Sequence, residues 1–125
     1  MAAIAPTITD ISEKGDKSVL KVVWNSLDST NNVGVAIRFS QWADRSVQMN
    51  GTFNAANVVF EGSNNGGGTY FTLTDPQGNA ILKAAAAGEA ITELTEYARP
   101  NSSGGGAGQD VEVSLIMRRA NPFRT

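Results

Sequence analysis

Apolar and polar residues alternate with a period of two over three stretches of the chain. In residues 33–40, the side chains of Val33, Val35, Ile37 and Phe39 fall on one face, and small or polar residues fall on the other. Residues 46–53 and 110–119 repeat this alternation. The pattern is typical of strands that bury one face, and it predicts antiparallel sheets with one solvated face. The side chains predicted to be buried are Val35, Ile37, Phe39, Val47, Met49, Phe53, Val113 and Leu115.

Five further stretches are expected to form strands: Ser18–Leu27, Asn57–Ser63, Tyr70–Thr74, Asn79–Lys83 and Thr95–Arg99. Asn50-Gly51 is a strong hairpin signal, but Gly51 is in phase with the inward face, so residues 46–53 are expected to form one strand. About eight short strands joined by loops rich in Gly, Asn, Ser and Asp indicate an all-β fold, an antiparallel β-sandwich of jelly-roll type. Trp24 lies in an apolar strand and is expected in the core.

Two segments do not fit the alternation. Residues 84–95 contain good helix formers at near-helical spacing, interrupted by Gly88 at a cost of about 1 kcal/mol, so a short helix and a strand are both possible. Residues 101–110 have neither apolar content nor periodicity, and we expect a mobile loop there.

The length of 125 residues is that of a single domain with its own core. Both ends lack strand alternation. We therefore expect an extended N-terminal arm over residues 1–17, a sandwich domain over residues 18–119 and a C-terminal tail over residues 120–125.

Composition excludes several classes of function. The net charge of −2 offers no electrostatic surplus for nucleic acid or an anionic membrane, so neither is expected as a partner. The chain has no cysteine and no histidine, which removes disulfides, thiol nucleophiles and imidazole or thiolate metal sites. Its start lacks a basic segment followed by an apolar run, and no run approaches the length of a membrane span, so we expect synthesis in a cytoplasm without a cleavable signal.

The polar residues show no catalytic pattern. The carboxylates are scattered without the facing pair that a glycosidase requires, and without histidine a serine nucleophile would need another base. Asp10, Glu13 and Asp16 lack the order of a calcium loop, so a charged arm is the better interpretation. We expect no enzymatic activity, no cofactor and no metal.

The polar stretch around residues 61–79 could be a binding loop or a corner between two strands. Ser63, Asn64 and Asn65 can bond their own backbone, and Gly66-Gly67-Gly68 lacks the ending of a phosphate loop. We therefore favour a corner.

Exposed apolar and basic residues are the best candidates for contacts with a partner. Trp42 follows a strand and is expected at the surface, and the tail combines arginines with an aromatic ring, which is compatible with a frayed end or with an anchor. The candidate contact residues are Ile4, Ile8, Ile11, Trp42, Arg118, Arg119, Phe123 and Arg124.

Two stretches, residues 51–81 ("GTFNAANVVFEGSNNGGGTYFTLTDPQGNAI") and residues 96–119 ("EYARPNSSGGGAGQDVEVSLIMRR"), resemble a pattern in small virion proteins of tailed bacteriophages. The family is that of capsid cement, or decoration, proteins of double-stranded DNA phages, with a jelly-roll sandwich. The resemblance implies a structural protein on the capsid exterior that binds the major capsid protein and copies of itself, as a dimer or trimer, and stabilises the shell. The alternatives are a carbohydrate-binding module and a receptor-binding or tail component of a virion.

Overall fold

The computed structural model describes residues 3–119, and every regular element in this part of the chain is a β-strand. None of these residues forms a helix that could cross a membrane. The strands are β1 (Thr7–Asp10), β2 (Val19–Leu27), β3 (Ile37–Arg38), β4 (Trp42–Thr52), β5 (Asn57–Ser63), β6 (Phe71–Thr72), β7 (Leu82–Lys83), β8 (Ala87–Ala90), β9 (Tyr97–Ser103) and β10 (Asp110–Arg119).

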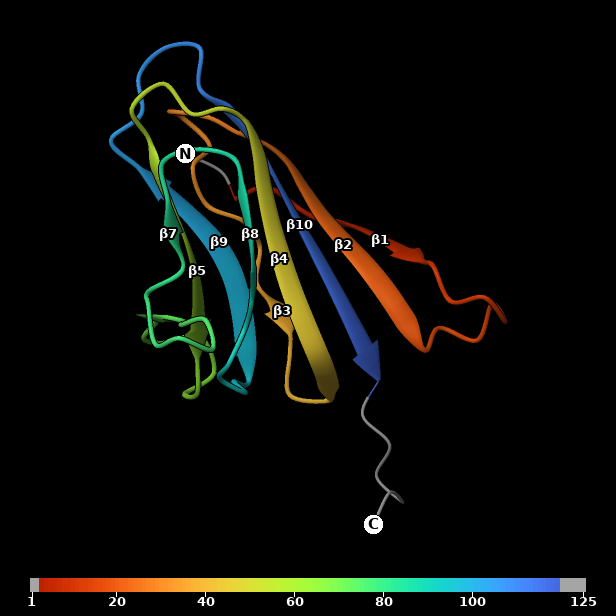
Figure 1. Ribbon diagram of the computed structural model, residues 1–125. Helices are drawn as coiled ribbons and strands as arrows, with labels where there is room; N and C mark the ends of the chain where they lie inside the picture. Colours follow the sequence, from red (N-terminus) through yellow and green to blue (C-terminus); the bar gives the residue numbers. More distant parts are fainter. Residues whose placement is uncertain (1–2, 120–125) are drawn as a thin grey trace.

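The strands form two antiparallel sheets that face one another (Figure 1). The first sheet has the order β1-β2-β10-β4-β8, and the long strands β2, β10 and β4 are its centre. The second sheet has the order β3-β9-β5-β6, and β7 pairs with the other end of β5. The predicted all-β class and antiparallel sandwich are confirmed, while the jelly-roll type stays a prediction.

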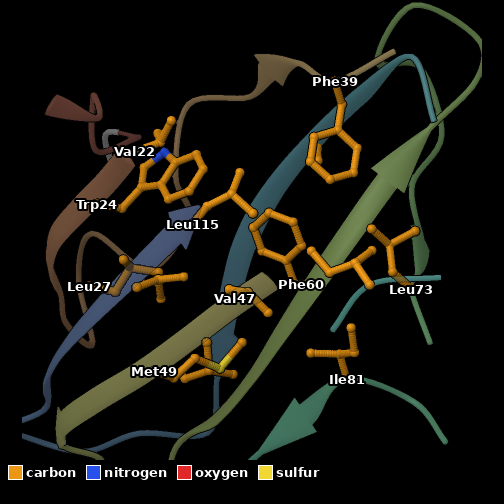
Figure 2. Packing of buried hydrophobic residues seen from close by; sticks show 14 of the residues in the cluster. Val22, Trp24, Leu27, Phe39, Val47, Met49, Phe60, Leu73, Ile81 and Leu115 are labelled. Atoms are coloured by element: carbon orange, nitrogen blue, oxygen red, sulfur yellow. The ribbon is translucent and has the colours of Figure 1, made fainter. Parts of the chain in front are cut away.

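The core lies between the sheets and is organised around three aromatic rings (Figure 2). The rings of Phe60 in the second sheet and Trp24 form an edge-to-face pair at a centroid distance of 6.0 Å, and the Phe39 ring lies 6.2 Å from Phe60 in a similar geometry. All three residues are fully buried. Edge-to-face pairs of this kind contribute about 0.5–1.5 kcal/mol beyond the burial of their area. The prediction that Trp24 belongs to the core is confirmed.

Two strands, β5 and β10, have the predicted bounds. Residues 46–53 continue through Asn50-Gly51 as one strand, as expected, up to Thr52. The ambiguous segment 84–95 contains the strand β8, which pairs with β4. Residues 101–103, expected in a mobile loop, end the strand β9. Together with β1, which was not predicted, β8 raises the number of strands in the described chain to ten.

The prediction for residues 33–40 was wrong in its phase at Gly34 and Val35, and right for Ile37 and Phe39. Val35, expected inside, is 43% exposed, while Gly34, expected outside, is buried. The reason is the indole of Trp24, because a Cβ added at Gly34 would lie 2.5 Å from its Cδ1. Only a residue without a side chain fits beneath this ring, so the glycine faces inward. Regular pairing in this segment is limited to Ile37–Arg38, and Ile37 packs partly against the core.

The expectation of an extended N-terminal arm over residues 1–17 was wrong for its central part. Thr7–Asp10 form the edge strand β1, which pairs with β2 from Thr7 opposite Val23 to Asp10 opposite Leu20. Ile4 is tied to the segment just before β3, since its N–H donates to Val33 O at 2.9 Å and its C=O accepts from Val35 N at 2.8 Å. Of the eight side chains predicted to be buried, the seven other than Val35 are buried or packed against the core.

Replacing Gly34 with alanine should lower the free energy of unfolding by about 1–3 kcal/mol, the usual cost of overpacking a core. Gly88→Ala in β8 is the matched control, because the nearest atom to its new Cβ is Val47 O at 3.7 Å, an ordinary contact. Chemical denaturation of both variants measures the difference. Equal stability of the two variants would show that the Trp24–Gly34 contact does not constrain the fold.

Candidate binding surfaces

The edge strand β1 carries an exposed isoleucine on its core-facing side. Ile8 lies opposite Val22, which is fully buried, yet Ile8 itself is 56% exposed. In Figure 1, β1 lies at the margin of the first sheet, on the side away from β5 and β7. The second sheet therefore does not cover it. Of the three isoleucines predicted as contacts in this segment, Ile8 is the most exposed.

Ile11 and Ile4 lie elsewhere. Ile11 follows β1 directly and is 44% exposed, and it lines a groove together with Lys21 on the outer face of the first sheet. Ile4 is half-buried and is bonded to Val33 and Val35. The structure thus places Ile8 and Ile11 at one margin but on opposite faces of the sheet, and it separates Ile4 from both.

The turn between β1 and β2 is held by two carboxylates. Asp10 accepts hydrogen bonds from Ser12 Oγ at 2.5 Å, from Ser12 N at 2.9 Å and from Lys17 N at 3.1 Å. Asp16 accepts one from Ser18 N at 3.1 Å. The serine hydrogen bonds lower the pKa of both carboxyl groups below their usual range. Within residues 3–119, no three acidic residues form a group that could hold a metal ion.

The prediction of an exposed Trp42 was wrong, because Trp42 is only 6% exposed and belongs to the core. Two residues of β4, Asp44 and Arg45, lie opposite the single residue Met117, since the β4–β10 register shifts between Ile116 and Arg118. Asp44 has a positive φ of 47°. This β-bulge moves Trp42 into phase with the inward-facing residues of β4.

The basic end of β10 is exposed but engaged within the chain. Arg118 forms an ion pair with Asp44, and Arg119 Nη2 donates to Lys17 O at 3.3 Å. Both arginines end the strand β10 next to the start of β4. Phe123 and Arg124, the other predicted contacts of the tail, lie outside the described residues.

The loop after β5 is closed by its own side chains. Ser63 Oγ donates to Asn65 Oδ1 at 2.8 Å and accepts from Gly67 N at 3.0 Å, and Asn65 Oδ1 also accepts from Thr69 N at 2.9 Å. Glu96 binds the loop from the side, because its Oε1 accepts from Gly66 N at 2.7 Å. These bonds favour the corner over the binding loop.

The turn at residues 75–79 is built in the same way. The buried carboxylate of Asp75 accepts from Gln77 N and Asn79 N, both at 3.0 Å. Asp75 and the loop at Ser63 are therefore parts of the framework, and their hydrogen-bonding groups are used locally.

A charged cluster lies on the outer face of the second sheet. Glu61 is 9% exposed and pairs with Arg99 Nε at 2.7 Å, and Asn101 Nδ2 lies 3.4 Å from the same carboxylate oxygen. The Arg99 guanidinium stacks on the Tyr70 ring at 3.7 Å. The cluster ties β9, β5 and the loop before β6 together.

A buried arginine was missed by the sequence analysis. Arg45 is 9% exposed, and its guanidinium lies over the Phe39 ring at 4.5 Å. Nη2 donates to Thr92 O at 3.5 Å, while Nε and Nη1 have no hydrogen-bond partner in the described chain. Burial lowers the pKa of Arg45, which the charges of Glu93 and Asp44 oppose. The alternation of residues 46–53 could have revealed it, because Arg45 is in phase with Val47 and Met49.

A groove of ≈ 1090 Å³ runs over the outer face of the first sheet. Ile11 and Lys21 flank one side, and Pro76–Gln77 and residues 86–90 flank the other. Its floor consists of outward-facing side chains of β4 and β10: Ser46, Gln48, Asn50, Glu112, Ser114 and Ile116. The lining mixes hydroxyl and amide groups with charged and apolar side chains, such as Lys21, Glu112 and Pro76, and it contains no aromatic ring.

No protein-family model matches the chain, and no curated protein matches it at a significant level. The resemblance to capsid cement proteins therefore stays a hypothesis based on the two sequence stretches.

Lowering the pH should open the β1–β2 turn. Because the pKa of Asp10 is lower in the folded chain, its stabilising effect is complete above the ordinary value of about 3.9 and is lost as the pH falls through the lowered value. We expect protection of the Ser12 and Lys17 amides against hydrogen exchange to fall below about pH 4. In Asp10→Asn the protection should be weak at every pH, and a wild-type profile in this variant would contradict the assignment.

Proposed function

We propose that the chain is a structural virion protein that binds the outer surface of a tailed-phage capsid in many copies and stabilises the shell. Its partners on the particle would be the major capsid protein and further copies of itself. The observation that carries the proposal is the pair of exposed isoleucines, Ile8 and Ile11, at one margin of a small sandwich. Large apolar side chains at an edge gain free energy only when another surface covers them.

The carboxylates support a role without catalysis. Glu61 is paired with Arg99, Glu93 is bonded to Thr74, and Asp75 closes a turn. Each of these groups has a hydrogen-bond or ion-pair partner within the framework, which supports a structural role. A protein that reinforces a shell needs only contacts, and many weak contacts add up through multivalency.

Binding to empty, expanded capsids of the phage that carries the gene tests the proposal. The double variant Ile8→Ser, Ile11→Ser should weaken saturable binding about thirtyfold, since each half-exposed side chain contributes roughly 1 kcal/mol when it is covered. Sedimentation of capsids with labelled protein measures the affinity.

Leu82→Ser, Leu94→Ser is the matched control, because these residues are 48% and 60% exposed at other places of the sandwich. It should bind as the wild type does. Equal losses of capsid affinity in the two double variants would show that Ile8 and Ile11 are not the specific contact. Absence of saturable binding by the wild type would refute the proposed function.

The groove favours a second candidate function, the recognition of a neutral glycan. Hydroxyl and amide side chains can both donate and accept hydrogen bonds, which suits sugar hydroxyl groups. The finding that weighs against it is the lack of an aromatic ring in the lining, because aromatic faces supply much of the apolar contact in small-molecule sites.

A glycan array separates the two functions. Gln48→Ala, Ser114→Ala should abolish glycan binding if the groove is used, without altering binding to capsids. Glycan binding by the wild type together with no capsid binding would replace the first proposal by the second.

A further inference from the structure

The first sheet ends in an open edge at β1. The sheet order places β1 outermost, with β2 as its one neighbour among the described strands. The opposite edge, β8, lines the same side of the groove as the turn at Pro76–Gln77, and the second sheet ends in strands of two residues. The longest edge without a flanking turn is therefore β1.

Two backbone hydrogen bonds show in which direction the free backbone groups of β1 point. Ile11 N donates to Val19 O at 3.0 Å, in continuation of the β1–β2 register. On the other side of β2, Arg119 N donates to Ser18 O at 2.8 Å, so the even-numbered residues of β2 bond β10 and the odd-numbered ones bond β1. Because antiparallel pairs alternate, the N–H and C=O of Ile8 and Asp10 point toward the open edge.

The β1 edge has few of the features that usually prevent strand pairing. It carries no lysine or arginine, and the carboxylate of Asp10 is turned back onto Ser12 and Lys17. Pro6 is in phase with the outward groups and has no N–H to offer, which is the one protective feature.

We propose that β1 pairs with β1 of a second copy about a two-fold axis through Ile8. In this antiparallel register Ile8 lies opposite Ile8 of the other copy, Asp10 opposite Pro6, and Thr7 opposite Thr9. The N–H of Asp10 meets the C=O of Pro6, so the missing proline donor leaves only the Asp10 C=O without a bond. The two Ile8 side chains lie side by side on the same face, and the threonines pair on the other face.

The pairing joins two five-stranded sheets into one continuous sheet, and its isologous symmetry is that of the commonest oligomers. A four-residue edge buries less than a stable dimer needs, so the free protein should be monomeric at micromolar concentration. The β1–β1 pairing matters on a capsid shell, where the local concentration of the protein is about millimolar, and this part of the inference rests on the proposed function. The pairing itself can be tested without any capsid.

Disulfide trapping tests the register, because the chain contains no cysteine of its own. In Ile8→Cys the two Cα atoms would lie about 5.5 Å apart, within the range that a disulfide spans. We expect Ile8→Cys to form covalent dimers about tenfold faster than Thr9→Cys or the exposed Ser29→Cys at about 1 mM protein, since only the first geometry fits a disulfide. Sedimentation of the wild type at the same concentration should show reversible dimers, and Ile8→Pro, which removes an outward N–H and leaves the bonds to β2, should not.

Two results would overturn the proposal: trapping of Ile8→Cys no faster than Ser29→Cys, or faster trapping of Thr9→Cys, which would indicate another register. If Ile8→Cys fails to fold, a wild type that stays monomeric at about 1 mM overturns the proposal by itself. Capsid binding without self-pairing would remove this inference alone, whereas self-pairing without capsid binding would remove the proposed function alone.

Discussion

The contact between the Trp24 indole and Gly34 is the constraint on which the rest of the structure depends. The indole is fully buried, meets Phe60 of the opposite sheet and donates from Nε1 to Val35 O at 3.0 Å. To admit it, the chain must pass close by without a side chain at Gly34, and Val35 then faces outward. Regular strand pairing after Gly34 is limited to Ile37–Arg38. The C=O of Val33 and the N–H of Val35 bond the backbone of Ile4 instead. The same ring thus shapes the core and fixes the chain just before β1.

A second constraint acts at the start of β4. Arg45 faces inward in phase with Val47 and Met49, and the bulge at Asp44–Arg45 turns Trp42 inward as well, so an aromatic ring and a charge enter the core at the same place. The Phe39 ring beneath the guanidinium compensates part of the cost of burying it, by about 0.5–2 kcal/mol for a cation over an aromatic face. Phe39 therefore stabilises the core twice, through its edge-to-face contact with Phe60 and through Arg45.

The strands predicted best lie inside their sheets: β10 buries every second residue, and β5 buries Val58 and Phe60 on its core side. β5 and β10 are paired on both sides, so burial alone decided their bounds. Val35 and Trp42 were misassigned because a close approach at Gly34 and a bulge at Asp44 shifted the phase, and both depend on residues distant in sequence. β1 was missed because Thr-Ile-Thr-Asp has one apolar residue, and its pairing comes from the backbone of β2. Of the predicted contact residues, Ile8 and Ile11 are exposed as expected, because no part of the described chain covers their side chains.

The exposure of Ile8 follows from the unequal reach of the two sheets. The second sheet covers Val22. Ile8, which lies opposite Val22 on β1, is beyond the area that the second sheet covers. Additional strands on the second sheet could have covered Ile8 within one chain, but the edge strand β3 is two residues long. The Asp10 turn nevertheless holds β1 in register, so the uncovered side chain and the outward backbone groups are presented in a fixed geometry. An edge held in this way loses less conformational entropy on pairing than a free arm would, which favours β1 as the place where a partner adds.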